Sequence, residues 1–122
     1  MTTPSTDLIG TWLLQSFDKE QADDSWQPWP RGAHGMLLYT AAGYMSASIN
    51  WPPDADGRFC DAYAGTWSVH GNEVRHHVTN SVRPKRIGKT LERRFSLDGD
   101  TLIIHLTNSD GHLRVCWQRA PV

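Results

Sequence analysis

Hydrophobic and polar residues alternate at every second position through most of this chain. A period of two is typical of a β-strand that buries one face, and no segment shows a convincing helical period. Turn signals rich in glycine, proline, asparagine and aspartate separate the alternating segments. The pattern predicts strands over residues 8–17, 35–40, 44–51, 62–70, 73–83, 89–97, 101–108 and 112–119.

The turns between these segments are short. Gly43, Gly71 and Gly99 each stand beside Ala, Asn or Asp between two alternating segments, and such turns make hairpins because glycine adopts positive φ at low cost. Consecutive hairpins form a meander, and closing it removes exposed strand edges. We therefore predict an all-β fold: one closed antiparallel up-and-down β-barrel of about eight strands. Residues 1–7 are expected to be a flexible N-terminal tail, and residues 8–122 the barrel domain.

The first predicted strand contains the sequence Gly10-Thr11-Trp12. A tryptophan near the start of strand one can plug the narrow end of a barrel, and a preceding glycine lets the backbone pass closely. The last strand ends at Arg119. We expect Arg119 to stack on Trp12 and to donate to nearby carbonyl groups at this closed end.

Several segments together resemble the lipocalin-like domain proteins of bacteria and fungi. The resemblance covers nearly the whole chain, and its segments are 8–12, 35–47, 63–69, 76–78, 93–102 and 117–119. It implies a lipocalin-like barrel that holds a small apolar molecule, and some relatives act as cyclases or isomerases in natural-product pathways. The stretch between Met45 and Tyr63 is shorter than is usual in the family, which indicates a truncated loop over the barrel mouth.

Composition narrows the function classes. The net charge of −1 argues against non-specific nucleic-acid binding, and we interpret the cluster 83–86, Arg-Pro-Lys-Arg, as a solvated loop. No run is apolar enough to cross a bilayer, and Cys60, Cys116 and the pair His76-His77 lack metal-ligand spacing. We expect a cytoplasmic protein with reduced thiols, without a metal or cofactor. The sequence is compatible with a homodimer.

Strand parity predicts which side chains point into the barrel. It places Trp12, Leu14 and Ser16 inside from the first strand, and apolar residues from all the others. The remaining apolar residues predicted to point inward are Leu37, Met45, Ala47, Ile49, Trp67, Val69, Val74, Val78, Val82, Leu91, Phe95, Leu97, Leu102, Ile104, Leu106, Leu113, Val115 and Trp117. The polar or ionisable residues predicted inside are Tyr39, Tyr63, His76, Asn80, Arg93 and Arg119. Because an unpartnered buried polar group costs about 1–3 kcal/mol, these groups must pair with one another or meet a ligand.

Three functions follow from this list. In the first, the barrel binds a small apolar or aromatic molecule, and the candidate ligand-binding residues are Tyr39, Tyr63, Trp67, His76, Asn80, Arg93 and Phe95. In the second, the protein is a cofactor-independent isomerase, cyclase or lyase: His76 is the general acid or base, Arg93 stabilises a developing anion and Tyr39 donates a proton. In the third, the interior is filled and the protein has a structural role.

Overall fold

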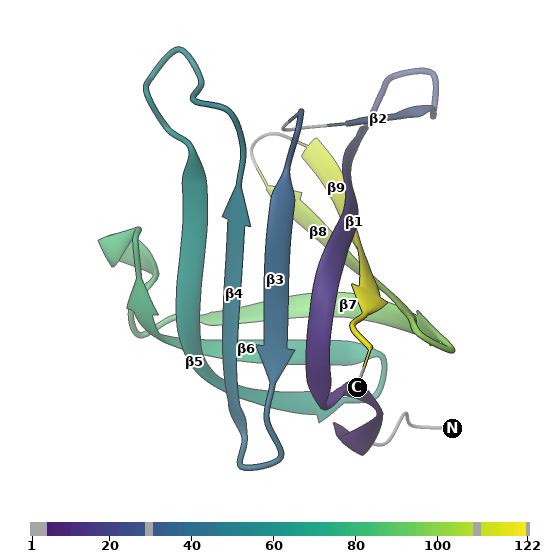
Figure 1. Cartoon of the computed structure of the whole chain (residues 1–122), viewed down its shortest axis with the longest axis vertical. Helices are drawn as coiled ribbons and strands as arrows, with labels where there is room; N and C mark the ends of the chain where they lie inside the picture. The colour runs from purple at the N-terminus through teal and green to yellow at the C-terminus, as the bar shows by residue number, and fades with distance from the viewer. Residues whose placement is uncertain (1–4, 29–30, 109–110, 122) are drawn as a thin grey trace.

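The computed structural model describes residues 5–28, 31–108 and 111–121, and its strands form one continuous antiparallel sheet (Figure 1). The 3₁₀ turns η1 (Ser5–Leu8) and η2 (Pro84–Arg86) flank this sheet. The strands are β1 (Gly10–Glu20), β2 (Trp26–Pro28), β3 (His34–Tyr39), β4 (Tyr44–Asn50), β5 (Cys60–His70), β6 (Glu73–Ser81), β7 (Thr90–Asp98), β8 (Thr101–Asn108) and β9 (Gly111–Arg119).

The sheet closes on itself, which confirms the predicted barrel. Apart from β2, each strand pairs with its neighbours in chain order, and β1 also pairs with β9 to complete the ring of eight. The short strand β2 extends from the far end of β1, where Glu20 is opposite Trp26. It lies in a segment that the sequence indicated to be a loop, because three residues are too few for periodicity to detect.

One end of the barrel is closed by Trp12, as predicted. Its side chain is fully buried, and its indole Nε1 donates to the Leu8 carbonyl at 3.0 Å. Arg119 stacks its guanidinium carbon 4.3 Å from the centre of the Trp12 ring. It also donates to the carbonyls of Ile9 and Asp7 at 3.0 and 2.8 Å. Leu8 itself is fully buried, so η1 packs under the barrel rather than away from it.

Two β-bulges correct the predicted parity. In β1 the pairing with β9 shifts between Leu14 and Ser16, so Phe17 rather than Ser16 points inward, opposite Val115. In β6 the pairing with β5 shifts between Ala64 and Gly65, so Asn80 lies opposite Ala64 and is exposed. The prediction that Asn80 lies inside was therefore wrong, because one extra residue in a strand reverses the faces of all the residues that follow.

Gly65 lets β5 and the bulged part of β6 approach each other closely. A Cβ atom at this position would stand 1.8 Å from the carbonyl oxygen of His77, which belongs to the bulged part of β6. Any other residue would therefore force the two backbones apart. Beyond the bulge, β6 separates from β7, and the connection through η2 turns back toward the barrel opening, at the left of Figure 1.

Candidate functional site

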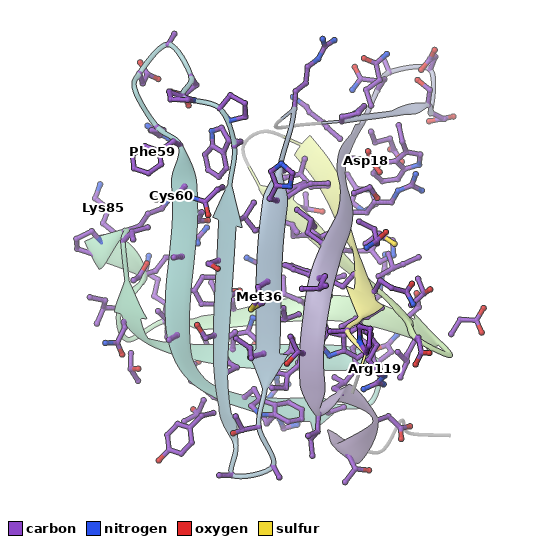
Figure 2. The ribbon with its side chains drawn as sticks, viewed as in Figure 1. Asp18, Met36, Phe59, Cys60, Lys85 and Arg119 are labelled. Atoms are coloured by element: carbon purple, nitrogen blue, oxygen red, sulfur yellow. The ribbon has the colours of Figure 1, made fainter. Side chains whose placement is uncertain are left out.

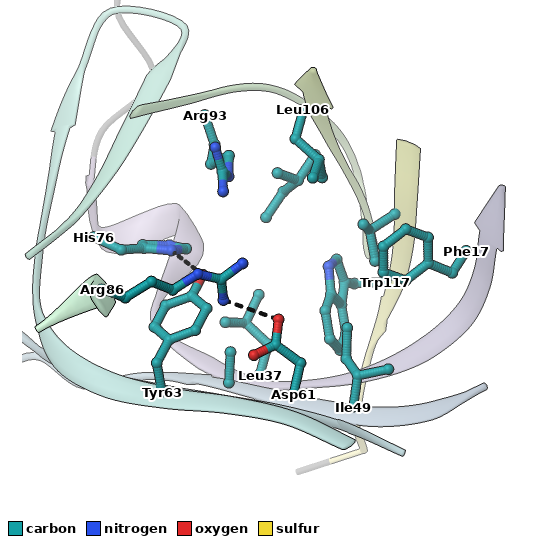
Figure 3. A pocket seen from close by; sticks show the side chains of 13 residues that line it. Phe17, Leu37, Ile49, Asp61, Tyr63, His76, Arg86, Arg93, Leu106 and Trp117 are labelled. Atoms are coloured by element: carbon teal, nitrogen blue, oxygen red, sulfur yellow. Dashed lines mark hydrogen bonds and ion pairs between the residues drawn. The ribbon is translucent and has the colours of Figure 1, made fainter. Parts of the chain in front are cut away.

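The barrel encloses a chamber of about 80 Å³ between its closed end and its mouth. A single water needs roughly 10–15 Å³ in the same measure, so the chamber has room for a small molecule or several waters. Most of its wall is apolar: Phe17, Leu37, Ala47, Ile49, Ile104, Leu106, Val115 and Trp117. Its polar groups are Asp61, Tyr63, His76, Arg86 and Arg93 (Figure 3).

His76 lies at the centre of a buried hydrogen-bonded chain of three side chains. Its Nε2 is 2.6 Å from the Tyr39 hydroxyl, and its Nδ1 is 2.8 Å from the Tyr63 hydroxyl. Both Tyr39 and His76 are almost fully buried, at 1% and 2% exposure. The alternation in β3, β5 and β6 brings the three residues together, because Tyr39, Tyr63 and His76 all lie on inward faces of these strands.

Burial keeps this chain electrically neutral. It lowers the pKa of His76 to about 3, with the Arg93 cation acting in the same direction. Burial also raises the pKa of Tyr63 to about 12, against the lowering effect of Arg93 and Arg86, and raises the pKa of Tyr39 well above its usual value. At neutral pH the chain therefore consists of two phenols and a neutral imidazole.

Arg93 differs from Arg86, the other cation of the chamber, in its lack of a close acceptor among the described residues. It comes from β7, opposite Val74 of β6, and its guanidinium lines the chamber (Figure 3). Among the residues that the structure describes, no acceptor lies within hydrogen-bond or ion-pair distance of it. Burial lowers the pKa of Arg93, as expected for a cation without a close anion, although arginine stays protonated at neutral pH.

Asp61 and Arg86 form the outer boundary of the chamber. Nη1 of Arg86 donates to Oδ2 of Asp61 at 2.9 Å, and Nε of Arg83 lies 3.6 Å from Oδ1 of the same carboxylate. The Arg86 guanidinium also stands 5.5 Å from the Tyr63 ring centre. Asp61 is therefore ion-paired with two arginines, although its buried Oδ1 accepts no hydrogen bond from the described residues.

Beyond this ion pair the barrel opens into a wider basin of about 570 Å³. The loop between β4 and β5 supplies one wall, including Trp51, Pro52 and Asp54. Five residues line both the chamber and the basin, which makes them the passage between the two: Phe17, Ile49, Asp61, Arg86 and Leu106.

The predicted site residues fall into three groups. Tyr63, His76 and Arg93 line the chamber. Tyr39, Trp67 and Phe95 are buried in the core but lie behind the chamber wall, where the Tyr39 and Trp67 rings pack 4.6 Å apart. Asn80 lies on the outer surface, as described above.

Three residues of the chamber were missed from the sequence. Phe17 was missed because of the β1 bulge. Asp61 was missed because β5 begins two residues earlier than predicted, and extending its alternation back from Tyr63 would have found it. Arg86 was missed because we interpreted its basic cluster as a solvated loop. That interpretation holds for the exposed Lys85, which Figure 2 shows pointing away from the barrel, but the neighbouring Arg86 points inward.

The described residues also bear on metal binding, disulfide formation and membrane-spanning helices. No group of three or more His, Cys, Asp or Glu side chains there could hold a metal ion. Cys60 and Cys116 are both free thiols. None of the described helical segments has the length and apolar character needed to span a bilayer.

The class of protein follows from this geometry: a small closed antiparallel barrel with an internal chamber. The chain belongs to the family of proteins with a lipocalin-like domain, since the family model matches residues 9–59 and 55–119. This confirms the resemblance seen in the sequence. No protein with curated annotation matches the chain in sequence.

Solved structures share the fold at low sequence identity. A redesigned β-barrel is 17% identical, with a TM-score of 0.54 over 99% of this chain and 98% of its own. The lipoprotein YedD from Klebsiella pneumoniae is 15% identical, with a TM-score of 0.52 over 99% of this chain and 77% of its own. A mutant of the fluorescent protein UnaG is 13% identical, with a TM-score of 0.51 over 98% of this chain and 100% of its own. At these identities the likeness concerns the fold.

Proposed function

We propose that this protein binds one small molecule with an apolar or aromatic body inside its barrel. The observation that carries this proposal is the chamber itself: apolar side chains surround a space that is also lined by the Arg93 guanidinium, which has no hydrogen-bond or ion-pair partner among the described residues. Arg93 is half-buried. A barrel with a purely structural role gains little from a half-buried cation without a close acceptor among the described residues, because even partial burial of a charge costs free energy. A ligand that enters from the basin would repay that cost.

The neutral fluorescent compound 2-naphthamide provides a test. We expect saturable one-site binding to the full chain, followed by the change in naphthyl fluorescence. Ala47→Phe fills the chamber from β4 and should weaken binding at least tenfold. Ala62→Phe is the matched control, because Ala62 lies opposite Ser48 on the outer face of β5 and lines an outer groove. It should leave binding within about twofold.

The outcome is read together with circular dichroism, so that an unfolded variant is recognised. Val115→Phe fills the same chamber from β9 and serves if Ala47→Phe does not fold. Unchanged binding in a folded chamber-filling variant would place the probe elsewhere and overturn the proposal. If the chamber-filling variants do lose binding, mass spectrometry of small molecules that co-purify with the native protein would identify the natural ligand class.

A second candidate is a cofactor-independent isomerase, cyclase or lyase. The chain from Tyr39 through His76 to Tyr63 favours it, because it ends at the chamber beside an arginine able to stabilise an anion. In such an enzyme Tyr63 would transfer the proton, since both nitrogens of His76 are occupied by the two tyrosines. Tyr63→Phe separates the candidates: a binding protein loses affinity, whereas an enzyme loses rate at similar affinity.

A further inference from the structure

Among the described residues, the polar side of the chamber has more unpartnered hydrogen-bond donors and positive charge than acceptors. Arg93 contributes a guanidinium with no partner among the described residues. On another strand, Trp117 lines the same chamber at 3% exposure, and its indole Nε1 is a buried donor to which the described residues offer no acceptor. Asp61 supplies one acceptor, because its Oδ1 has no hydrogen-bond partner among the described residues, but its charge is neutralised by ion pairs with Arg86 and Arg83.

Tyr63 adds a third donor, and the hydrogen-bonded chain shows why. A neutral histidine has one N–H and one acceptor nitrogen, so one tyrosine donates to His76 and the other accepts from it. The Tyr39 hydroxyl is deeply buried, and among the described residues His76 is its one hydrogen-bond partner. If Tyr39 accepted from His76, its own proton would be buried without an acceptor, at a cost of about 1–3 kcal/mol.

The proton order is therefore fixed from the inside outward. Tyr39 donates to Nε2 of His76, and Nδ1–H of His76 donates to the Tyr63 oxygen. The Tyr63 O–H is left free, at a side chain that lines the chamber. Tyr39 and His76 thus act as positioning residues, which turn the Tyr63 proton toward whatever occupies the chamber.

We infer that the ligand of the proposed binding site carries a carboxylate, held by the Arg93 guanidinium and the Tyr63 hydroxyl while its apolar body lies against Ile104, Leu106 and Trp117. A carboxylate accepts hydrogen bonds without donating any, and its two oxygens match the planar fork of a guanidinium. One unpaired arginine neutralises a single negative charge, so a monoanion fits better than a doubly charged phosphate ester. This inference rests on the proposed function, because it specifies the head group of the same ligand.

The test compares three probes that share one apolar body: 2-naphthoate, the neutral 2-naphthamide and the cationic 2-naphthylmethylamine. At neutral pH we expect 2-naphthoate to bind at least tenfold more tightly than the amide, and the amine to bind most weakly. Arg93→Met should remove most of the preference for naphthoate and change amide binding by no more than about threefold. Lys85→Met is the matched control: it removes an exposed cation near the mouth that does not line the chamber, and should preserve the preference.

A separate set of measurements tests which nitrogen of His76 carries the proton. Tyr63→Phe should weaken naphthoate binding three- to tenfold. Tyr39→Phe should weaken it by a smaller factor although Tyr39 does not line the chamber, because Nε2 of His76 then loses its donor and the two neutral tautomers become closer in free energy. Nitrogen NMR of His76 should show the proton on Nδ1 in the parent and a larger share of the Nε2-protonated form in Tyr39→Phe. A parent histidine protonated on Nε2 would overturn this order.

The two proposals fail in different ways. If 2-naphthamide binds in the chamber but 2-naphthoate binds no more tightly, the carboxylate inference is wrong and the binding function stands. A naphthoate preference that survives Arg93→Met but disappears in Lys85→Met would also overturn the inference, because the anion would then be held at the surface. If none of the three probes binds the folded chain, the proposed function itself is wrong.

Discussion

The closed end and the chamber of this barrel each contain a half-buried arginine beside aromatic rings, but the two arginines differ in their partners. At the closed end Arg119 donates to two carbonyls, pairs with Asp100 at 3.1 Å and stacks on Trp12. In the chamber Arg93 lacks any such partner among the described residues. A buried polar group that is fully satisfied within the chain stabilises the fold, whereas one left unsatisfied indicates a missing partner. The comparison therefore separates a structural arginine from a candidate binding residue.

The largest expected effect concerns the closed end. Trp12→Ala should lower the free energy of unfolding by about 3–5 kcal/mol, because it removes a fully buried aromatic side chain and the ring under Arg119. Urea unfolding measures the loss. Tyr44→Ala is the control, since Tyr44 is 61% exposed; its effect should stay below about 0.5 kcal/mol. Equal effects of the two substitutions would contradict the closed-end assignment.

The next effect depends on pH and concerns the chamber. The pKa of His76 is about 3 in the folded protein and 6.5 in the unfolded chain. Between these values the unfolded chain binds a proton that the folded chain does not, so stability is lost as the pH falls from 6.5 toward 3. The parent should lose about 2–3 kcal/mol more than His76→Gln between pH 6 and pH 4. Urea unfolding at both pH values provides the measurement. Parallel pH profiles for the two proteins would show that His76 is accessible to protons.

The smallest effect tests the comparison directly with the same substitution in both regions. Arg119→Met should destabilise the protein by about 2 kcal/mol, because it removes a partly buried hydrogen bond to the Ile9 carbonyl, an exposed one to the Asp7 carbonyl and the cation stacked on Trp12. Arg93→Met should change the stability of the ligand-free protein by less than about 1 kcal/mol, and a gain is consistent with removing an unpaired buried charge. Thermal unfolding of both variants decides the matter. A large loss for Arg93→Met would mean that Arg93 holds the barrel together.

Alternation and turn chemistry determined most of this fold from the sequence. Each of the eight predicted strands exists, because a half-buried strand must place an apolar residue at every second position. The same argument placed Trp12 beside Arg119 and directed Tyr63, His76 and Arg93 into the barrel. These are local properties: each depends on a residue's own strand and on the hairpins that order the strands.

The tertiary structure alone decided where that alternation breaks. The bulges in β1 and β6 arise from how neighbouring strands fit around a closed ring, and they turn Phe17 inward and Asn80 outward. Likewise, only the path of the chain through η2 brings Arg86 to Asp61, 25 residues away in sequence. Whether a buried polar side chain finds a hydrogen-bond partner also depends on the assembled barrel. A sequence can show that His76 and Arg93 point inward. Only their surroundings show that His76 has both its partners and that Arg93 has none in the part of the chain that the structure describes.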